Sequence, residues 1–123
     1  MRALRICAVL LGLALMLGEA YRTWGADRPI PFWMDDMIMG AALIAAAALV
    51  GRETVARRAF FTGAWGFNAG MLYSSFFSKL YDPGAAAPGN FDLGVLTFLI
   101  GVAFAVSIIG FVGSAIWPQR REA

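Results

Sequence analysis

Three carboxylates near the ends of apolar segments are the side chains best placed to do chemistry in this sequence. Glu19 ends the first apolar run, and Asp35 and Asp36 begin the second. A carboxylate at the edge of hydrocarbon is costly unless it is capped, paired or hydrated, so such groups often mark an ion or proton site. The ordinary alternative is that Asp35 and Asp36 cap a helix, with Arg22 or Arg28 neutralising one of them. The group is thus either an acidic outer mouth or a set of helix-end charges.

Residues 59–78 form a central apolar run that carries polar side chains for which a helix facing only lipid has no use. At 100° per residue, Asn68 and Ser75 fall on one face. Such groups either line a polar path between the third and fourth helices or bond across a helix pair, at about 0.6 kcal/mol each, and fix its register. We favour register, and predict that Asn68 has a hydrogen-bond partner on a neighbouring helix.

Small residues line the opposite face of the same run. Gly66 and Gly70 are four positions apart, and Gly63 and Ser74 extend the stripe by a turn each way. A stripe of this kind lets a neighbouring backbone come close. We predict that it makes the tightest helix contact in the protein, so that Gly70→Leu lowers stability through overpacking.

The usual catalytic and metal-binding side chains are scarce. The chain has no histidine, and Cys7 is its only cysteine, which excludes an intrachain disulfide or a cysteine metal cluster. Met34, Met37 and Met39 offer soft sulfurs suited to Cu(I), but methionine more often fills gaps in packing. No nucleotide-binding loop or activated nucleophile is present. We expect a protein that is not an enzyme and has no metal or cofactor.

The composition indicates an integral membrane protein. Hydrophobic residues make up 60% of the 123 residues and charged residues 15%, against about 45–50% apolar residues in soluble proteins. The sequence pI is about 9.1, but the basic residues are scattered at segment ends, a pattern that does not indicate nucleic acid. The partners expected are the lipid bilayer and other membrane subunits or further copies of this chain.

The apolar segments predict an all-α fold, an integral membrane antiparallel four-helix bundle in which residues 1–123 form a single transmembrane domain. The helices are expected over residues 3–21, 34–51, 58–79 and 92–117. The loop at residues 80–92, rich in turn dipeptides, is expected to pack least and move most. The first segment also has the pattern of a signal peptide over residues 1–20, but its cleavage site is poor, so we expect it to be retained.

The charges predict the orientation. Seven of the ten basic residues and two acidic residues lie at one side of the predicted bundle, and three basic and six acidic residues at the other. By the positive-inside rule both termini are cytoplasmic, in a bacterial cytoplasmic (inner) membrane. Interfacial aromatic belts account for the tryptophans, with Trp24 and Trp33 outside and Trp65 and Trp117 inside.

Two functions follow from this pattern. The first is a small multi-pass membrane protein without a catalytic centre, acting as an accessory or interaction subunit. The alternative is a small transporter or channel-like oligomer for a cation or small solute that enters through the acidic mouth. A hydrated cavity joining Glu19 or Asp35 to Asn68 would favour transport, and a dry core would favour the accessory role.

Overall fold

All the secondary structure in the described part of the chain is helical. The computed structural model describes residues 1–25, 30–85 and 88–118. Its elements are α1 (Arg2–Thr23), α2 (Ile30–Leu49), α3 (Val55–Tyr81), the short 3-10 helix η1 (Pro83–Ala85) and α4 (Leu93–Ile116). The prediction of an all-helical chain with four helices is confirmed, although several boundaries differ.

The start of α2 differs most from the prediction. The helix begins at Ile30 rather than at residue 34, with Pro31 in its first turn. A proline is tolerated there because the first N–H groups of a helix have no intrahelical partner to lose. Asp35 and Asp36 therefore lie beyond the first turn of α2, and the interpretation of them as N-terminal caps is wrong.

The helices α3 and α4 begin at side-chain caps. Thr54 Oγ1 accepts a hydrogen bond of 3.1 Å from the N–H of Arg57, and Asp92 Oδ2 accepts one of 3.2 Å from the N–H of Val95. Each cap satisfies one of the N–H groups that a helix start leaves free. The Thr54 cap explains why α3 begins at Val55, ahead of the predicted residue 58.

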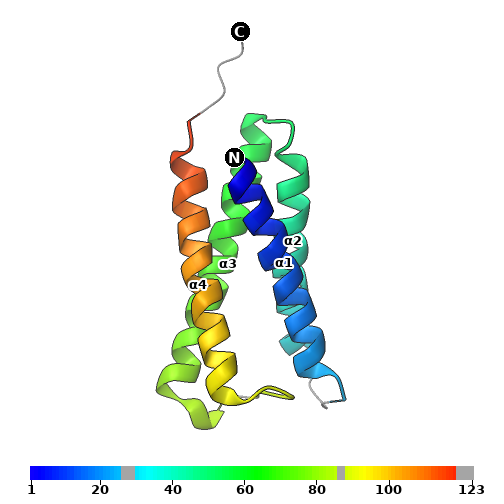
Figure 1. Ribbon diagram of the computed structural model, residues 1–123, viewed down its shortest axis with the longest axis vertical. Coiled ribbons are helices and arrows are strands. Elements are labelled where there is room, and N and C mark those ends of the chain that lie inside the picture. The colour runs from blue at the N-terminus through cyan, green and yellow to red at the C-terminus, as the bar shows by residue number, and fades with distance from the viewer. Residues whose placement is uncertain (26–29, 86–87, 119–123) are drawn as a thin grey trace.

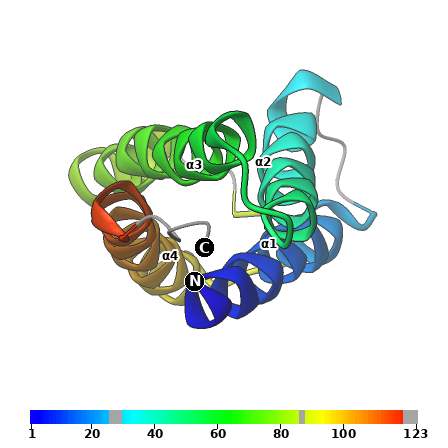
Figure 2. The ribbon, with the colours of Figure 1, turned by 90° about the horizontal axis from the view of Figure 1, so that it is seen from above.

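The four helices form two hairpins (Figures 1 and 2). The first pairs α1 with α2 and the second pairs α3 with α4, while contacts between α2 and α3 join the two; α1 and α4 have the fewest contacts of these neighbouring pairs. The helices α1 and α4 meet near the N-terminus, where a Cβ on Gly113 would lie 3.6 Å from Leu4. They diverge toward the other end (Figure 1).

The main core lies where α1, α2 and α3 meet and includes Ala8, Leu43, Phe61 and Trp65. The Trp65 side chain is fully buried, and a Cβ on Gly110 of α4 would approach its ring carbons Cε2 and Cε3 to 2.5 Å. The prediction that Trp65 belongs to an interfacial belt is therefore wrong. Trp24 and Trp117 are exposed, and the side chain of Trp33 lies outside the described residues.

The predicted glycine stripe of α3 faces outward. Nothing lies within 4 Å of a Cβ placed on Gly63 or Gly70, and only Gly66 has a close neighbour, the Phe111 ring at 2.9 Å. Ser74 is exposed. The prediction that this stripe makes the tightest helix contact is wrong, because α3 instead turns inward the face that carries Phe61, Trp65 and Leu72.

Among the glycines of the described helices, the closest approach to another helix's backbone joins α1 to α2. A Cβ on Gly40 would lie 2.5 Å from the carbonyl oxygen of Gly12, and a Cβ on Gly12 would lie 2.8 Å from that of Gly40. Each glycine leaves room for the other helix's backbone. This crossing fixes which residues of α1 and α2 can meet further along the hairpin.

Basic side chains hold the end of the molecule that carries the N-terminus. Arg5 Nε donates a hydrogen bond of 2.8 Å to the carbonyl of Ala47, near the end of α2. Arg58 Nη2 donates a hydrogen bond of 3.3 Å to the carbonyl of Ser114. It also donates one to the carbonyl of Trp117, at the end of α4. These bonds satisfy carbonyls at the negative ends of two helix dipoles.

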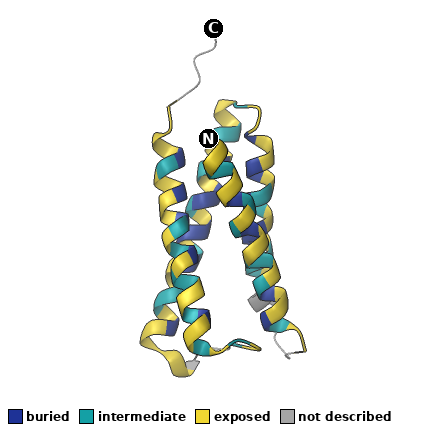
Figure 3. Cartoon of the chain, in the orientation of Figure 1, coloured by how far each residue is buried: buried dark blue, intermediate teal, exposed yellow. Residues whose placement is uncertain are grey.

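Two helices of the described chain, α1 and α4, are long and apolar enough to cross a membrane, judged by length and composition. Both have many exposed positions along their length (Figure 3), and several of these carry large apolar side chains. Leu17 is 67% exposed, Phe98 69% and Ile109 67%. Such outer surfaces are compatible with contact to lipid.

Candidate functional site

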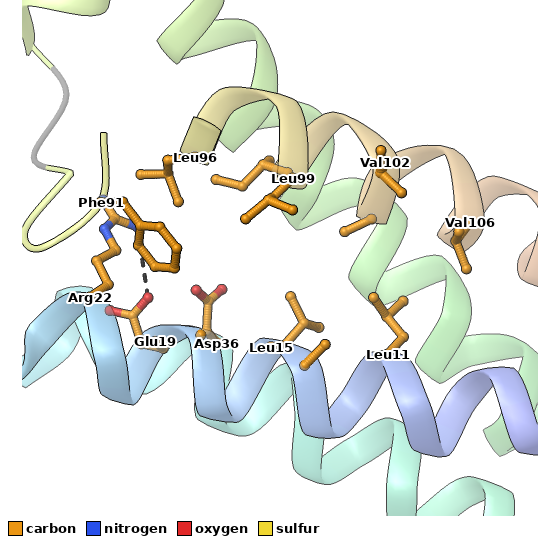
Figure 4. A pocket seen from close by; sticks show the side chains of 14 residues that line it. Leu11, Leu15, Glu19, Arg22, Asp36, Phe91, Leu96, Leu99, Val102 and Val106 are labelled. Atoms are coloured by element: carbon orange, nitrogen blue, oxygen red, sulfur yellow. Dashed lines mark ion pairs between the residues drawn. The ribbon is translucent and has the colours of Figure 1, made fainter. Parts of the chain in front are cut away.

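A cavity of about 250 Å³ lies between α1, α2 and α4, where α1 and α4 diverge. Figure 4 shows its two long walls, with Leu11 and Leu15 of α1 on one side and Leu99 and Val102 of α4 on the other. The remaining apolar lining residues are Ala14, Gly18, Phe91, Leu96, Ile100, Ala103 and Val106. We call this space the α1–α4 cleft.

The only charged side chains among the described residues that line the cleft are Glu19, Arg22 and Asp36, and they lie together at one end (Figure 4). Glu19 is 2% exposed and Arg22 8%. Arg22 Nη1 lies 3.7 Å from Glu19 Oε2, and Thr23 Oγ1 donates a hydrogen bond of 2.9 Å to Glu19 Oε1. Since a buried charge is costly without partners, these bonds are what allow Glu19 to stay in place.

Asp36 reaches the same end of the cleft from α2, and its carboxyl group lies beside that of Glu19 (Figure 4). Their approach depends on the Gly12–Gly40 crossing, which brings α1 and α2 close enough for side chains on the two helices to meet.

Of the predicted acidic group, the structure brings Glu19 and Asp36 together in the cleft. Asp35 lies beside them but is not among the lining residues, and its Oδ1 accepts a 2.8 Å hydrogen bond from the N–H of Asp36. Of the two arginines expected to neutralise this group, Arg22 pairs with Glu19. Arg28 lies outside the described residues.

The segment before α4 packs beside the charged end of the cleft, which the sequence did not lead us to expect. Asn90 Nδ2 donates 2.7 Å hydrogen bonds to the carbonyls of Tyr21 and Trp24, at the end of α1. Phe91 lies edge-on to Tyr21, with ring centroids 4.8 Å apart. Part of the loop that was expected to pack least therefore packs against the end of α1, while residues 86–87 lie outside the described residues.

Gly89 makes this docking sterically feasible. Its φ of +60° is in the left-handed region that favours glycine, and a Cβ there would overlap the carbonyl oxygen of Arg22. The Pro88-Gly89 dipeptide indicated a turn in the sequence. The helix against which this turn docks could not be predicted, because the Asn90 bonds span 66 and 69 positions of the chain.

Asn68 has the structural part predicted for it. The Asn68 side chain is fully buried. Its Nδ2 donates a hydrogen bond of 3.2 Å to the carbonyl of Met39 and one of 2.9 Å to the carbonyl of Ala64. The expected cross-helix hydrogen bond is present, and its partner, the carbonyl of Met39, is on α2. Asn68 is not among the residues that line the α1–α4 cleft.

Ser75 and the methionines also lie apart from the cleft. Ser75 Oγ accepts a 2.8 Å hydrogen bond from Lys79 Nζ, one turn later on α3. Met39 is 1% exposed and packs with Leu72 and Ala103, whereas Met34 is 38% exposed. The structure thus separates Met39 from Met34 by burial, in keeping with the packing role of methionine.

The α1–α4 cleft therefore joins apolar walls to one charged end, an arrangement that accepts an apolar chain along its length and a polar group at its mouth. Comparisons of the chain with models of protein families, with curated proteins and with solved structures found no match.

Proposed function

We propose that this chain is a multi-pass integral membrane protein that acts without catalysis, as an accessory or interaction component, and that its binding surface is the α1–α4 cleft. All four helices cross a bacterial cytoplasmic membrane as an antiparallel bundle with both termini inside. The observation that carries the proposal is the cleft itself, an apolar space of about 250 Å³ between two helices of membrane-spanning length. In this proposal the α1–α4 cleft opens toward lipid. It therefore serves to bind a partner within the membrane rather than to carry out a reaction in water.

The charge distribution supports the orientation. Arg5 and Arg58, bound to carbonyls at the ends of α2 and α4, lie at the same end of the molecule as the N-terminus. Glu19 lies near the end of α1 and Asp36 in the first half of α2, toward the opposite end of these helices. This is the asymmetry that the positive-inside rule associates with a cytoplasmic and an external face.

Reporter fusions test the orientation. A reporter active only in the cytoplasm is expected to be active when fused after Ala123 and inactive when inserted between Ala85 and Ala87. The reverse pattern would overturn the proposed orientation. Mass spectrometry of the purified protein tests retention of the first segment, which a mature N-terminus at Tyr21 would refute.

Transport is the alternative function, and it needs a polar path from the acidic group to Asn68. The cleft lining supports binding instead, because away from Glu19, Arg22 and Asp36 its described walls are apolar. Cation flux into liposomes containing the purified protein tests this choice. If the protein has the accessory role, cation flux into these liposomes should be no higher than into protein-free liposomes. A higher flux that is lowered by Asp35→Asn or Asn68→Ala would establish transport.

A further inference from the structure

The α1–α4 cleft is closed at one end and charged at the other, which limits what can occupy it. Leu4 and Gly113 meet near the N-terminus, so a partner's transmembrane helix, which must run the whole thickness of the bilayer, cannot lie between α1 and α4. A flexible alkyl chain can enter from the side. The walls offered to it are Leu11, Leu15 and the facing residues of α4.

The charged end lies beside residues suited to the lipid head groups. Tyr21 and Trp24, on the same turn of α1 as Arg22 or next to it, are 56% and 81% exposed. Tyrosine and tryptophan are the side chains that gather at the membrane–water interface. A molecule whose chain lies along Leu15 and Leu99 would therefore place its polar group at Glu19, Arg22 and Asp36 (Figure 4).

The charges of this end select among polar groups. Two carboxyl groups and one guanidinium line it, so it offers carboxyl oxygens that can accept hydrogen bonds from a head group as well as N–H groups that can donate to one. A primary ammonium carries a positive charge and three N–H donors. The Arg22 guanidinium has five N–H donors, suited to the oxygens of a phosphate as well as to Glu19. A head group with both a phosphate and a primary amine matches the site.

We propose that the α1–α4 cleft binds a membrane phospholipid whose head group carries a primary amine, with an acyl chain between α1 and α4, the ammonium at Asp36 and the phosphate at Arg22. This inference rests on the proposed function, since it names the occupant of the binding surface assigned there. It gives the carboxyl groups of buried Glu19 and half-buried Asp36 a role in recognition that packing alone does not require.

Lipid photolabelling of the full-length protein in nanodiscs tests the inference. Three phospholipids with identical photoreactive acyl chains are compared, bearing a primary amine, a trimethylated amine or an anionic glycerol head group. The glycerol lipid lacks the ammonium that hydrogen-bonds to Asp36 in the proposed complex. Labelling of cleft residues is therefore expected to be about tenfold lower with the glycerol lipid than with the primary-amine lipid. The trimethylated lipid, which keeps the charge but lacks N–H donors, is expected between them.

Asp36→Asn is expected to remove most of the preference for the primary amine, and Glu53→Gln, at the other end of the molecule, to leave it unchanged. The comparison of lipids on the unaltered protein does not depend on whether a variant folds. Equal labelling of the cleft by all three lipids would overturn the head-group inference and leave the proposed binding surface standing. Absence of label from α1 and α4 cleft residues with every lipid would refute the binding surface itself.

Discussion

The contact of Gly110 with Trp65 supplies a sharp test of how α3 and α4 pack. A Cβ at Gly110 would come within 2.5 Å of Trp65 Cε2 and Cε3, whereas carbon atoms in contact prefer about 3.5–4.0 Å. The ring would have to move by about 1 Å, and Trp65 is fully buried, so the movement displaces the core. Overpacking of this kind costs about 1–3 kcal/mol.

Gly70 is the matched control for Gly110→Ala. Both glycines lie inside helices, so replacement by alanine gains the same helix propensity of about 1 kcal/mol in each, while nothing lies within 4 Å of a Cβ on Gly70. The free energy of unfolding in mixed micelles should therefore be about 1–3 kcal/mol lower for Gly110→Ala than for Gly70→Ala. Equal free energies, or a larger loss at Gly70, would refute the observed rotation of α3 and restore the outward stripe as a packed face.

Three further predictions concern side chains that join helices. Asn68→Asp should lower the free energy of unfolding by more than Asn68→Leu does. The aspartate sets a carboxylate against the carbonyls of Met39 and Ala64, whereas leucine keeps a similar volume and loses a cross-helix hydrogen bond worth about 0.6 kcal/mol. Equal losses would refute the donor role of Asn68. Asn90→Ala should speed amide hydrogen exchange at the end of α1, because it removes two 2.7 Å bonds to α1 carbonyls, and unchanged exchange would show that the loop does not hold α1. Arg58→Met should increase the mobility of a spin label placed at Ile116, because Arg58 donates hydrogen bonds to the carbonyls of Ser114 and Trp117 at the end of α4. Arg52→Met is the control. Equal mobility in the two variants would show that Arg58 does not hold the end of α4.

The helices could be predicted from the sequence because each depends on a local apolar run. The apolar segments and the caps at Thr54 and Asp92 act within a few residues. The start of α2 was misjudged because Pro31 is compatible with a first helical turn as well as with a loop. The need of Asn68 for a partner was likewise a local inference, since a buried amide must be hydrogen-bonded wherever its helix packs.

What the sequence did not reveal is the choice between helix faces and the contacts between distant segments. The small-residue face and the Trp65 face of α3 are both suited to packing, and only competition with the other three helices decides which is buried. The acidic group was singled out from residue type, but its geometry depends on the Gly12–Gly40 crossing. The contribution of Asn90 and Phe91 to the cleft depends on docking against α1, for which neither residue carries a local signal.

The separation of α1 from α4 is the central claim, and paired cysteines in a Cys7→Ala background measure it in the native membrane. Leu4→Cys with Gly113→Cys marks the end where the helices meet, and Leu15→Cys with Leu99→Cys marks the two walls of the cleft. With a short bifunctional thiol reagent, the first pair should cross-link faster, while each cysteine of the second pair should react with a maleimide dissolved in the lipid. Cross-linking of the second pair as fast as the first, with both cysteines protected from that maleimide, would show α1 and α4 packed together and contradict the cleft.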